Sequence, residues 1–317
     1  MFHYRAYGLN ITSEFHLPEL PTGGNGDDLC IRSGNVTLPP LQATSIKRQG
    51  IEAYFGGATM EAYLRWPDVG RFLAREGREL IVAAGPAGAG NKQLLNLYIL
   101  SEALGMILCQ RGVFLLHASA VKLGEQVILF AGLPGAGKST LAAAFAQQGG
   151  VGLCDDMVAI TFEARRQPVV WPGFPQIKIW PPTIEGLGYT ASSLPPLFEG
   201  SRKRVISKAD NFPQAPLPLT HIFFLETAEA YNLRRMNDAE ALFALVRFFP
   251  CPSDMLQGRF LRQHFQQCNQ LLRSVEVWKL ESPKNFKVLS KMIGMIEEQI
   301  RPREVTASMN KHNFSNG

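Results

Sequence analysis

Residues 127–139, VILFAGLPGAGKS, carry the clearest structural signal in the chain. The run Val127–Ala131 is uniformly apolar, as a buried strand is, and the segment Lys138–Gln148 after it has the composition of a helix. Between them, Gly132–Ser139 matches the pattern G-x-x-x-x-G-K-[ST] at every fixed position. A strand, a glycine-rich loop and a helix in this order indicate an α/β fold.

Residues 132–139, here called the glycine loop, are expected to bind nucleotide phosphates. Backbone N–H groups and the helix N-terminus would face the phosphates, Lys138 would reach the β- and γ-phosphates, and the Ser139 hydroxyl would bind Mg²⁺. The residues predicted to contact ATP are Gly132, Leu133, Pro134, Gly135, Ala136, Gly137, Lys138, Ser139 and Thr140. The similar run Gly85–Asn91 lacks the lysine and the hydroxyl, so we predict a hinge there.

Two carboxylates and one histidine are expected near this loop. Asp155 and Asp156 follow the apolar run Val151–Cys154, so they would lie at the end of a neighbouring strand. One carboxylate can hold Mg²⁺ while the other accepts the proton of an attacking hydroxyl. We assign the base to Asp155 and the metal to Asp156, although the spacing also permits the reverse. His117 ends another apolar run, where a structural histidine is the alternative to a phosphate contact.

Three elements in this order resemble the catalytic domain of HPr kinase/phosphorylase: His117-Ala-Ser, the glycine loop, and Asp155-Asp156 followed by Met-Val-Ala-Ile. The resemblance covers residues 93–300 and extends to HPr-kinase-like proteins found beside peptide-modification genes, such as lasso-peptide precursor kinases. It implies the P-loop kinase fold shared with phosphoenolpyruvate carboxykinases, and a serine kinase that uses ATP and Mg²⁺. It also implies that His117, Lys138, Asp155 and Asp156 are catalytic and that Ser139 and Asp156 bind the metal.

The chain departs from this family at its second signature, Leu-Glu-Ile-Arg-Gly-Leu-Gly. The matching segment here is Gln176–Trp180, with Lys178 where the family has arginine. Lys178 is therefore either a cation for the transferring phosphoryl group or a surface lysine at a strand edge. The basic cluster Arg202–Arg204 is interpreted as a solvated loop, with attraction of an acidic peptide or a clamp for phosphate as the alternatives.

The predicted organisation is a β-rich N-terminal domain over residues 1–91 that ends in the glycine-rich hinge, a catalytic domain over 92–300, and a flexible tail over 301–317. Strands in the first part are predicted at Leu29–Arg32, Ala53–Phe55, Ala62–Trp66 and Leu80–Ala83. Later elements are predicted as a helix at Lys92–Gln110, strands at Leu217–Leu225 and Val275–Leu280, helices at Ala239–Phe248 and Asp254–Arg273, and a final amphipathic helix up to Ile300.

Composition excludes several classes of protein. The 317 residues are 46% hydrophobic with a net charge of +5, which describes an ordinary globular protein and does not call for a nucleic-acid partner. Five scattered cysteines contain no C-x-x-C pair, so neither a zinc site nor a disulfide framework is expected, and a reducing cytoplasmic compartment is favoured. The apolar stretch Leu94–Cys109 is too short to cross a membrane.

Taken together, these observations predict an ATP- and Mg²⁺-dependent kinase that transfers the γ-phosphoryl group to a serine of a protein or peptide. Two alternatives stay open: a regulatory protein that senses ATP without transferring phosphate, and a small-molecule kinase on the same site. The hexamers of the resembled family leave self-association open too.

Overall fold

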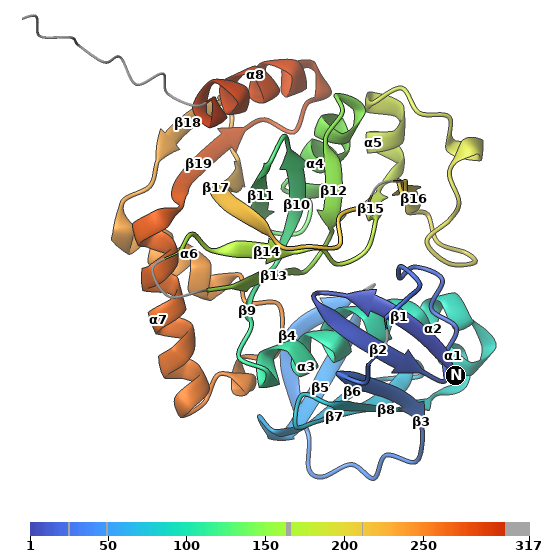
Figure 1. Ribbon diagram of the computed structural model, residues 1–317. Helices are drawn as coiled ribbons and strands as arrows, with labels where there is room; N and C mark the ends of the chain where they lie inside the picture. The colour runs from blue at the N-terminus through green and yellow to red at the C-terminus, as the bar shows by residue number, and fades with distance from the viewer. Residues whose placement is uncertain (25, 49, 163–165, 211, 302–317) are drawn as a thin grey trace, which may run out of the picture.

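The computed structural model describes residues 1–24, 26–48, 50–162, 166–210 and 212–301. Its mixed α/β architecture contains two large sheets, an eight-stranded one built from the N-terminal residues and a nine-stranded one built from the rest (Figure 1). The predicted α/β class is confirmed. Of the predicted tail, residues 302–317 lie outside the described part of the chain.

The first sheet has the strand order β1-β2-β3-β8-β7-β6-β5-β4, so β1 and β4 are its edges. All neighbouring strands are antiparallel except the pairs β2–β3 and β3–β8. The predicted N-terminal strands fall within β3, β5, β6 and β8. The bounds are β1 (Phe2–Ala6), β2 (Leu9–Ser13), β3 (Leu29–Ser33), β4 (Gln42–Arg48), β5 (Ile51–Ala58), β6 (Glu61–Trp66), β7 (Gly70–Arg75) and β8 (Glu79–Ala84).

A helical segment follows where the sequence predicts a hinge. Residues Pro86–Gly90 form helix α1, which packs on β7 and β8. Its Gly88 approaches the first sheet so closely that a Cβ atom would lie 2.2 Å from the Val69 carbonyl oxygen. Glycine therefore permits close packing at this position. The division of the chain into domains at residue 91 stays a prediction.

The helix predicted over Lys92–Gln110 is present, but it is interrupted. It consists of α2 (Lys92–Tyr98), a π-helical turn η1 (Ile99–Ala103) and α3 (Leu104–Gln110). Ser101 leaves the helical region, with φ −105° and ψ −115°. Figure 1 shows these helices against the first sheet, on the side that faces the second. The interruption places Glu102 in the interior, where its partners are described below.

The second sheet is built around β17, which runs parallel to β11 on one side and to β19 on the other. Its strands are β9 (Phe114–Leu116), β10 (Ala118–Leu123), β11 (Gln126–Gly132), β12 (Val151–Cys154), β13 (Val158–Thr161), β14 (Val169–Trp171), β17 (Leu217–Thr227), β18 (Asn232–Arg235) and β19 (Glu276–Ser282). A separate two-stranded ribbon pairs β15 (Gln176–Ile179) with β16 (Arg204–Ser207). The strands predicted in this half are confirmed, with ends shifted by a few residues.

Five α-helices and three short 3₁₀ turns complete the described chain. They are α4 (Lys138–Gln147), α5 (Pro181–Gly186), η2 (Ala191–Ser193), α6 (Asp238–Arg247), η3 (Ser253–Met255), α7 (Arg259–Ser274), η4 (Phe286–Val288) and α8 (Leu289–Ile300). The predicted start of a helix at Asp254 is wrong, because Gly258 takes φ +53° directly before α7 and breaks any continuous helix from η3.

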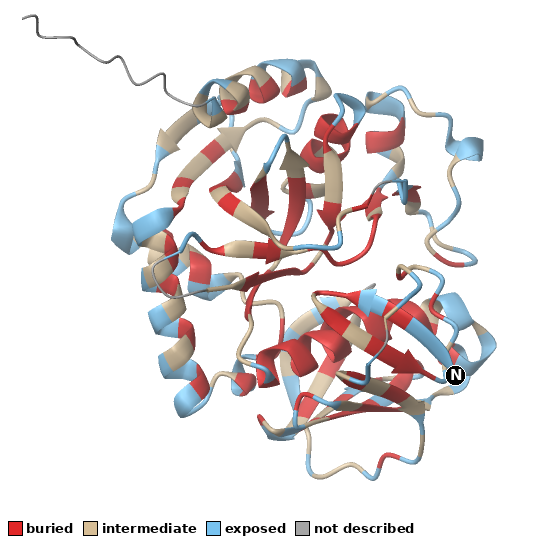
Figure 2. Ribbon diagram, in the orientation of Figure 1, coloured by how far each residue is buried: buried red, intermediate tan, exposed pale blue. Residues whose placement is uncertain are grey.

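Strand β11 shows how the second sheet is buried on both faces. Ile128 and Phe130 pack with residues of α4 and α8, whereas Val127, Leu129 and Ala131 point into a core shared with α6 and α7. The core that contains Val127, Leu129 and Ala131 continues without a break into the first sheet and helices α2 and α3. Figure 2 shows buried residues concentrated in both sheets and in α3 and α4. The glycine loop thus follows a strand that is fixed from both sides.

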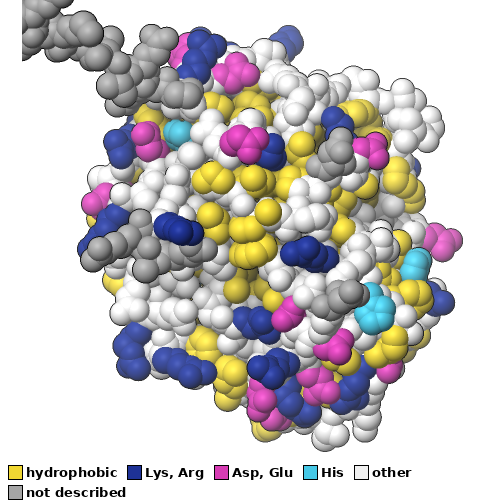
Figure 3. Space-filling view, in the orientation of Figure 1, with side chains coloured by type: hydrophobic (Ala, Val, Ile, Leu, Met, Phe, Trp, Pro, Cys, Tyr) yellow, Lys and Arg dark blue, Asp and Glu magenta, His cyan; other side chains and the backbone are white. Residues whose placement is uncertain are grey.

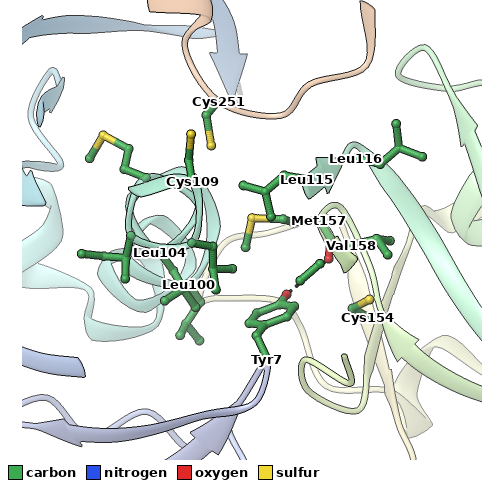
Figure 4. Packing of buried hydrophobic residues seen from close by; sticks show 14 of the residues in the cluster. Tyr7, Leu100, Leu104, Cys109, Leu115, Leu116, Cys154, Met157, Val158 and Cys251 are labelled. Carbon is green, nitrogen blue, oxygen red and sulfur yellow. Dashed lines mark hydrogen bonds between the residues drawn. The ribbon is translucent and has the colours of Figure 1, made fainter. Parts of the chain in front are cut away.

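The two sheets meet around Met157, the residue after the Asp155–Asp156 pair. The Tyr7 hydroxyl donates a hydrogen bond of 3.3 Å to the Met157 carbonyl oxygen (Figure 4). Leu104 of α3 and Leu115 of β9 belong to the same buried cluster. Burial raises the pKa of the Tyr7 hydroxyl well above its usual value, so this group stays a neutral donor.

The surface carries charges of both signs. Figure 3 shows Lys, Arg, Asp and Glu side chains interspersed over one face, with hydrophobic side chains between them. This mixture agrees with the small net charge of +5. Among the residues described, no helix has both the length and the apolar character that crossing a membrane requires.

The Tyr7 contact generates a prediction about stability. Tyr7→Phe should lower the free energy of unfolding by about 1–2 kcal/mol, because the Met157 carbonyl loses a buried hydrogen bond while the packing is retained. Urea denaturation measures this difference. Tyr63→Phe, which removes a hydroxyl bound to Glu61 at the surface, should change stability by less than about 0.5 kcal/mol. Equal losses in the two variants would contradict a special role for the Tyr7 contact.

Candidate active site

The glycine loop connects β11 to α4 and lies at the end of the two parallel strands β11 and β17. Gly132 has φ +149°, and a Cβ atom there would lie 2.7 Å from the Leu225 carbonyl oxygen of β17. Gly137, directly before α4, has φ +104°. Both positions therefore favour glycine, one for its close approach to a strand and both for their backbone conformation. The strand, loop and helix occupy the places that the sequence predicts.

Lys138 folds back onto its own loop in this structure. Its Nζ donates to the carbonyl oxygens of Gly132 at 2.8 Å and of Leu133 at 3.2 Å. Burial lowers the pKa of the Lys138 ammonium, although the nearby Asp156 and Asp155 carboxylates favour its charged form. The loop carbonyls thus accept the hydrogen bonds that Lys138 Nζ would donate to a bound phosphate. A phosphate ligand would have to replace these carbonyls as the partner of Lys138.

Asp155 is the most enclosed carboxylate of the site and is only 3% exposed. Its Oδ1 accepts hydrogen bonds from the Ser119 hydroxyl at 2.5 Å and the Ser139 hydroxyl at 2.9 Å. Its Oδ2 accepts from the backbone N–H of Lys178 at 2.9 Å. Asp155 and Ser139, which the sequence places together, are therefore in direct contact.

Asp156 lies beside Asp155 but has different partners. It has φ +73°, a left-handed conformation that few residues other than glycine adopt. Its Oδ2 is 3.0 Å from Lys178 Nζ and 3.6 Å from Arg48 Nη1. Burial raises the pKa of Asp156, but the Lys178 and Arg48 cations outweigh burial and hold this pKa well below its usual value. Asp156 is therefore ionised at neutral pH.

His117 joins β9 to β10 and contacts the Asp pair through the backbone. Its Nδ1 is 2.9 Å from the Asp156 carbonyl oxygen, which can only accept, so Nδ1 carries the hydrogen. Burial, followed by the Lys138 charge, lowers the pKa of His117. The ring is accordingly neutral at neutral pH, and its Nε2 is left as an acceptor. A neutral Nε2 suits a metal ion or a hydroxyl donor better than it suits a phosphate oxygen.

Lys178 is buried, with 4% of its surface exposed, so its interpretation as a surface lysine is wrong. Strand β15 places it so that its backbone binds Asp155 and its side chain binds Asp156. Of the basic cluster 202–204, Lys203 acts electrostatically on both Asp156 and Lys138. The Nζ atom of Lys203 also lies 5.2 Å from the centre of the Trp180 ring. Trp180 is 52% exposed to solvent.

The other predicted contacts of the loop differ in exposure. Leu133 is 52% exposed, and Pro134 and Gly135 are exposed with it, whereas Ala136 is half-buried. The Thr140 hydroxyl shares a hydrogen bond of 2.9 Å with Thr183 of α5. Thr140 is thus engaged with α5 in this structure, and its contact with a nucleotide stays a prediction.

The sequence pattern does not predict two residues that lie at this site, Arg48 and Glu102. Arg48 and Glu102 form an ion pair of 2.8 Å, and Arg48 extends from this pair toward Asp156. Arg48 belongs to an ordinary strand and Glu102 to an apolar helix. The only available signal was a single acidic residue inside an otherwise apolar stretch, which points to a buried partner without identifying it.

The donor atoms present fit a magnesium ion. The Ser139 hydroxyl and the two carboxylates offer oxygen ligands, which Mg²⁺ prefers. Within the described ranges, no group of three His, Cys, Asp or Glu side chains is arranged as a preformed metal site. Such a cation would therefore need further ligands, as Mg²⁺ has when it binds together with nucleotide phosphates.

Comparisons with known proteins give only a distant likeness. No family model matches the chain, and no curated protein matches it. Among solved structures, the chain is similar to the HPr(Ser) kinase/phosphatase from Coxiella burnetii, with a TM-score of 0.31 and 13% identity. That match covers 58% of this chain and 91% of the other. Because a TM-score this low does not establish a shared fold, the function has to be inferred from the site itself.

The neutral state of His117 predicts how stability depends on pH. Its pKa in the folded protein lies below the 6.5 of an unperturbed histidine, so the unfolded chain binds more protons as the pH falls below 6.5. His117 therefore makes the protein lose stability between pH 6.5 and the lowered pKa. In His117→Gln, the free energy of unfolding should fall less between pH 7.5 and pH 5.5 than in the native protein. Replacing the exposed His3 by Gln is the control, and an unchanged pH dependence in His117→Gln would rule this account out.

Proposed function

We propose that the protein is an ATP- and Mg²⁺-dependent kinase that transfers the γ-phosphoryl group to a serine hydroxyl of a protein or peptide. The observation that carries the proposal is the direct contact of Ser139, in the glycine loop, with Asp155, next to the ionised Asp156. A hydroxyl at the start of a helix, beside a pair of carboxylates at the end of a strand, supplies the oxygen atoms that hold Mg²⁺ with nucleotide phosphates in phosphate-loop proteins.

Phosphate binding would use groups that now bond to each other. Lys138 would leave the carbonyl oxygens of Gly132 and Leu133 and bind the β- and γ-phosphates, while the N–H groups of the loop and of the first turn of α4 bind the remaining oxygens. Lys178 and Lys203 add positive charge near Asp156, where charge develops during transfer. The affinity of the site for a polyanion follows from these cations and backbone dipoles together.

The metal ion supplies charge neutralisation of the phosphates when it is bound. Ser139 and Asp156 are the residues proposed to hold it, since Asp156 is ionised at neutral pH and its Oδ1 has no hydrogen bond among the described residues. This assignment follows the one made from the sequence, and the exchanged assignment is an outcome of the test below.

Transfer would place the acceptor serine hydroxyl against Asp155. The Oδ1 of Asp155 already accepts hydrogen bonds from the hydroxyls of Ser119 and Ser139. The hydroxyl of a substrate serine is the same chemical group and could bind Oδ1 in the same way. The acceptor oxygen forms a bond to the γ-phosphorus as the bond to the β-phosphate oxygen breaks. The hydroxyl proton passes to Asp155, and ADP leaves. The acceptor would have to take the place of the Ser139 hydroxyl, because Asp155 is otherwise enclosed.

Lys138→Ala should weaken ATP binding about 10- to 100-fold, the equivalent of roughly 1.5–3 kcal/mol for a charge-assisted contact, and should abolish turnover. Titration with a fluorescent ATP analogue measures the affinity. Lys92→Ala, at an exposed position of α2, is the matched control and should bind like the native protein. Native affinity and turnover in Lys138→Ala would end the kinase proposal.

Asp155→Asn keeps the size of the side chain but cannot take a proton. Its amide oxygen can still accept from the Lys178 N–H, while its NH₂ group would donate to the serine hydroxyls. Phosphoryl transfer to a serine acceptor should fall by roughly 10²- to 10⁴-fold, with ATP affinity nearly unchanged. Asp156→Asn should raise the Mg²⁺ requirement and weaken nucleotide binding together. Asp254→Asn, at an exposed position, serves as the control for the substitution itself.

The two results together decide between the alternatives. The opposite pattern in the two variants would exchange the roles of Asp155 and Asp156. If both variants transfer phosphate at the native rate, or if the native protein binds ATP and phosphorylates no acceptor, the ATP-sensing function replaces the kinase.

A further inference from the structure

Arg48 brings the first sheet into contact with the site. It is the last residue of the edge strand β4, and its side chain is only 16% exposed. One end of the guanidinium, Nη2, donates to Glu102 Oε1 at 2.8 Å. The other end, Nη1, lies 3.6 Å from Asp156 Oδ2. A residue distant in sequence from every predicted site residue therefore contacts one of the two central carboxylates.

Glu102 fixes the orientation of this guanidinium. The glutamate is buried in η1, and its Oε2 accepts a hydrogen bond of 2.7 Å from the Ser101 hydroxyl. Although burial favours the neutral acid, the Arg48 cation and these hydrogen bonds keep the pKa of Glu102 below its usual value. Because the guanidinium is planar and rigid, fixing Nη2 on Glu102 also fixes the direction of Nη1.

No other hydrogen bond competes for Arg48 in the described chain. Its Nε is buried and has no hydrogen-bond partner there, and the ion pairs of its guanidinium in the described chain are those with Glu102 and Asp156. Asp156 in turn receives one cation from each part of the fold, Arg48 from β4 and Lys178 from β15. Both cations lie near the same oxygen, Oδ2, and Oδ1 has no hydrogen bond among the described residues.

We propose that Arg48 is a positioning residue of the phosphotransfer site, which holds the Asp156 carboxylate so that Oδ1 is presented to the metal–nucleotide complex. This inference rests on the function proposed above. It gives the N-terminal sheet a role in the reaction: the sheet supplies one of the two cations that orient Asp156. Glu102 orients Arg48 through one ion pair, and Arg48 orients the Asp156 carboxylate through a second.

The test must separate positioning from folding, because removing Arg48 alone leaves Glu102 buried without a counter-ion. The double variant Arg48→Met/Glu102→Gln removes both charges and keeps a hydrogen-bonding partner for Ser101. The full-length protein is titrated with Mg²⁺ in the presence of a fluorescent ATP analogue, and its melting temperature and its hydrolysis of Mg-ATP to ADP and phosphate are measured in parallel.

The double variant should melt near the native temperature and yet need about 10- to 100-fold more Mg²⁺ for half-maximal nucleotide binding, the usual loss when a partner of a metal ligand is removed. Its hydrolysis rate should fall with it. Lys47→Gln, the neighbouring cation on β4 that pairs with the surface residue Glu52, is the matched control and should keep the native Mg²⁺ requirement.

Arg48→Lys keeps the counter-ion of Glu102 and so folds even if the double variant does not. A lysine is a point charge that cannot contact both carboxylates in the same way, and this variant should share the Mg²⁺ defect. A native Mg²⁺ requirement in Arg48→Lys or in a folded double variant would overturn the inference while leaving the kinase proposal intact. If the native protein shows no Mg²⁺-dependent ATP binding, the proposed function itself fails, and the inference fails with it.

Discussion

Lys178 is the residue on which the arrangement of the two central carboxylates depends. Its backbone N–H binds Asp155 at 2.9 Å, and its side-chain ammonium binds Asp156 at 3.0 Å. Asp155 then meets the glycine loop through Ser139, and Asp156 meets the first sheet through Arg48. A single buried residue of a short two-stranded ribbon therefore links the loop, the Asp pair and the N-terminal sheet.

The backbone of Asp156 adopts an unfavourable conformation in this arrangement. A left-handed φ in a residue other than glycine costs roughly 1–3 kcal/mol and persists only where the surroundings hold it in place. Here the restraints come from three sides: His117 binds the Asp156 carbonyl, Lys178 and Arg48 bind its carboxylate, and Tyr7 anchors Met157 just beyond it. Strain that is held this firmly is common at functional sites, and it agrees with the role proposed for the pair.

The sequence was informative wherever the relevant chemistry is local. A glycine pattern predicts the strand Val127–Ala131 and the helix Lys138–Gln148 on its two sides, and β11 and α4 match them to within one residue. The Asp pair is expected at the end of a strand, where β12 places it. Local pattern gave no sign of helix α1 at residues 86–90, because small residues that permit close packing on Val69 have the same composition as a linker. The helix start expected at Asp254 failed for a related reason, the conformation of Gly258.

Long-range contacts could not be predicted in this way. Whether Lys178 lies at a surface or in the interior depends on how β15 packs beside the Asp pair, and no short pattern encodes that packing. The contact of Arg48 with Glu102 depends on the register of an edge strand. It also depends on a π-helical turn that lies 54 positions later in the chain. The charge of Glu102 within an apolar helix signals a buried partner, but only the tertiary fold supplies its identity.

The most direct test of the account is a structure of the protein bound to Mg²⁺ and a non-hydrolysable ATP analogue. We expect the triphosphate to lie along residues 132–139, with Lys138 Nζ moved from the Gly132 and Leu133 carbonyls onto the β- and γ-phosphates. Ser139 and Asp156 should then lie at the metal and Asp155 beside the γ-phosphate. A nucleotide bound elsewhere, or a Lys138 that still bonds to its own loop with the nucleotide in place, would contradict the claim that this loop binds the phosphates for transfer.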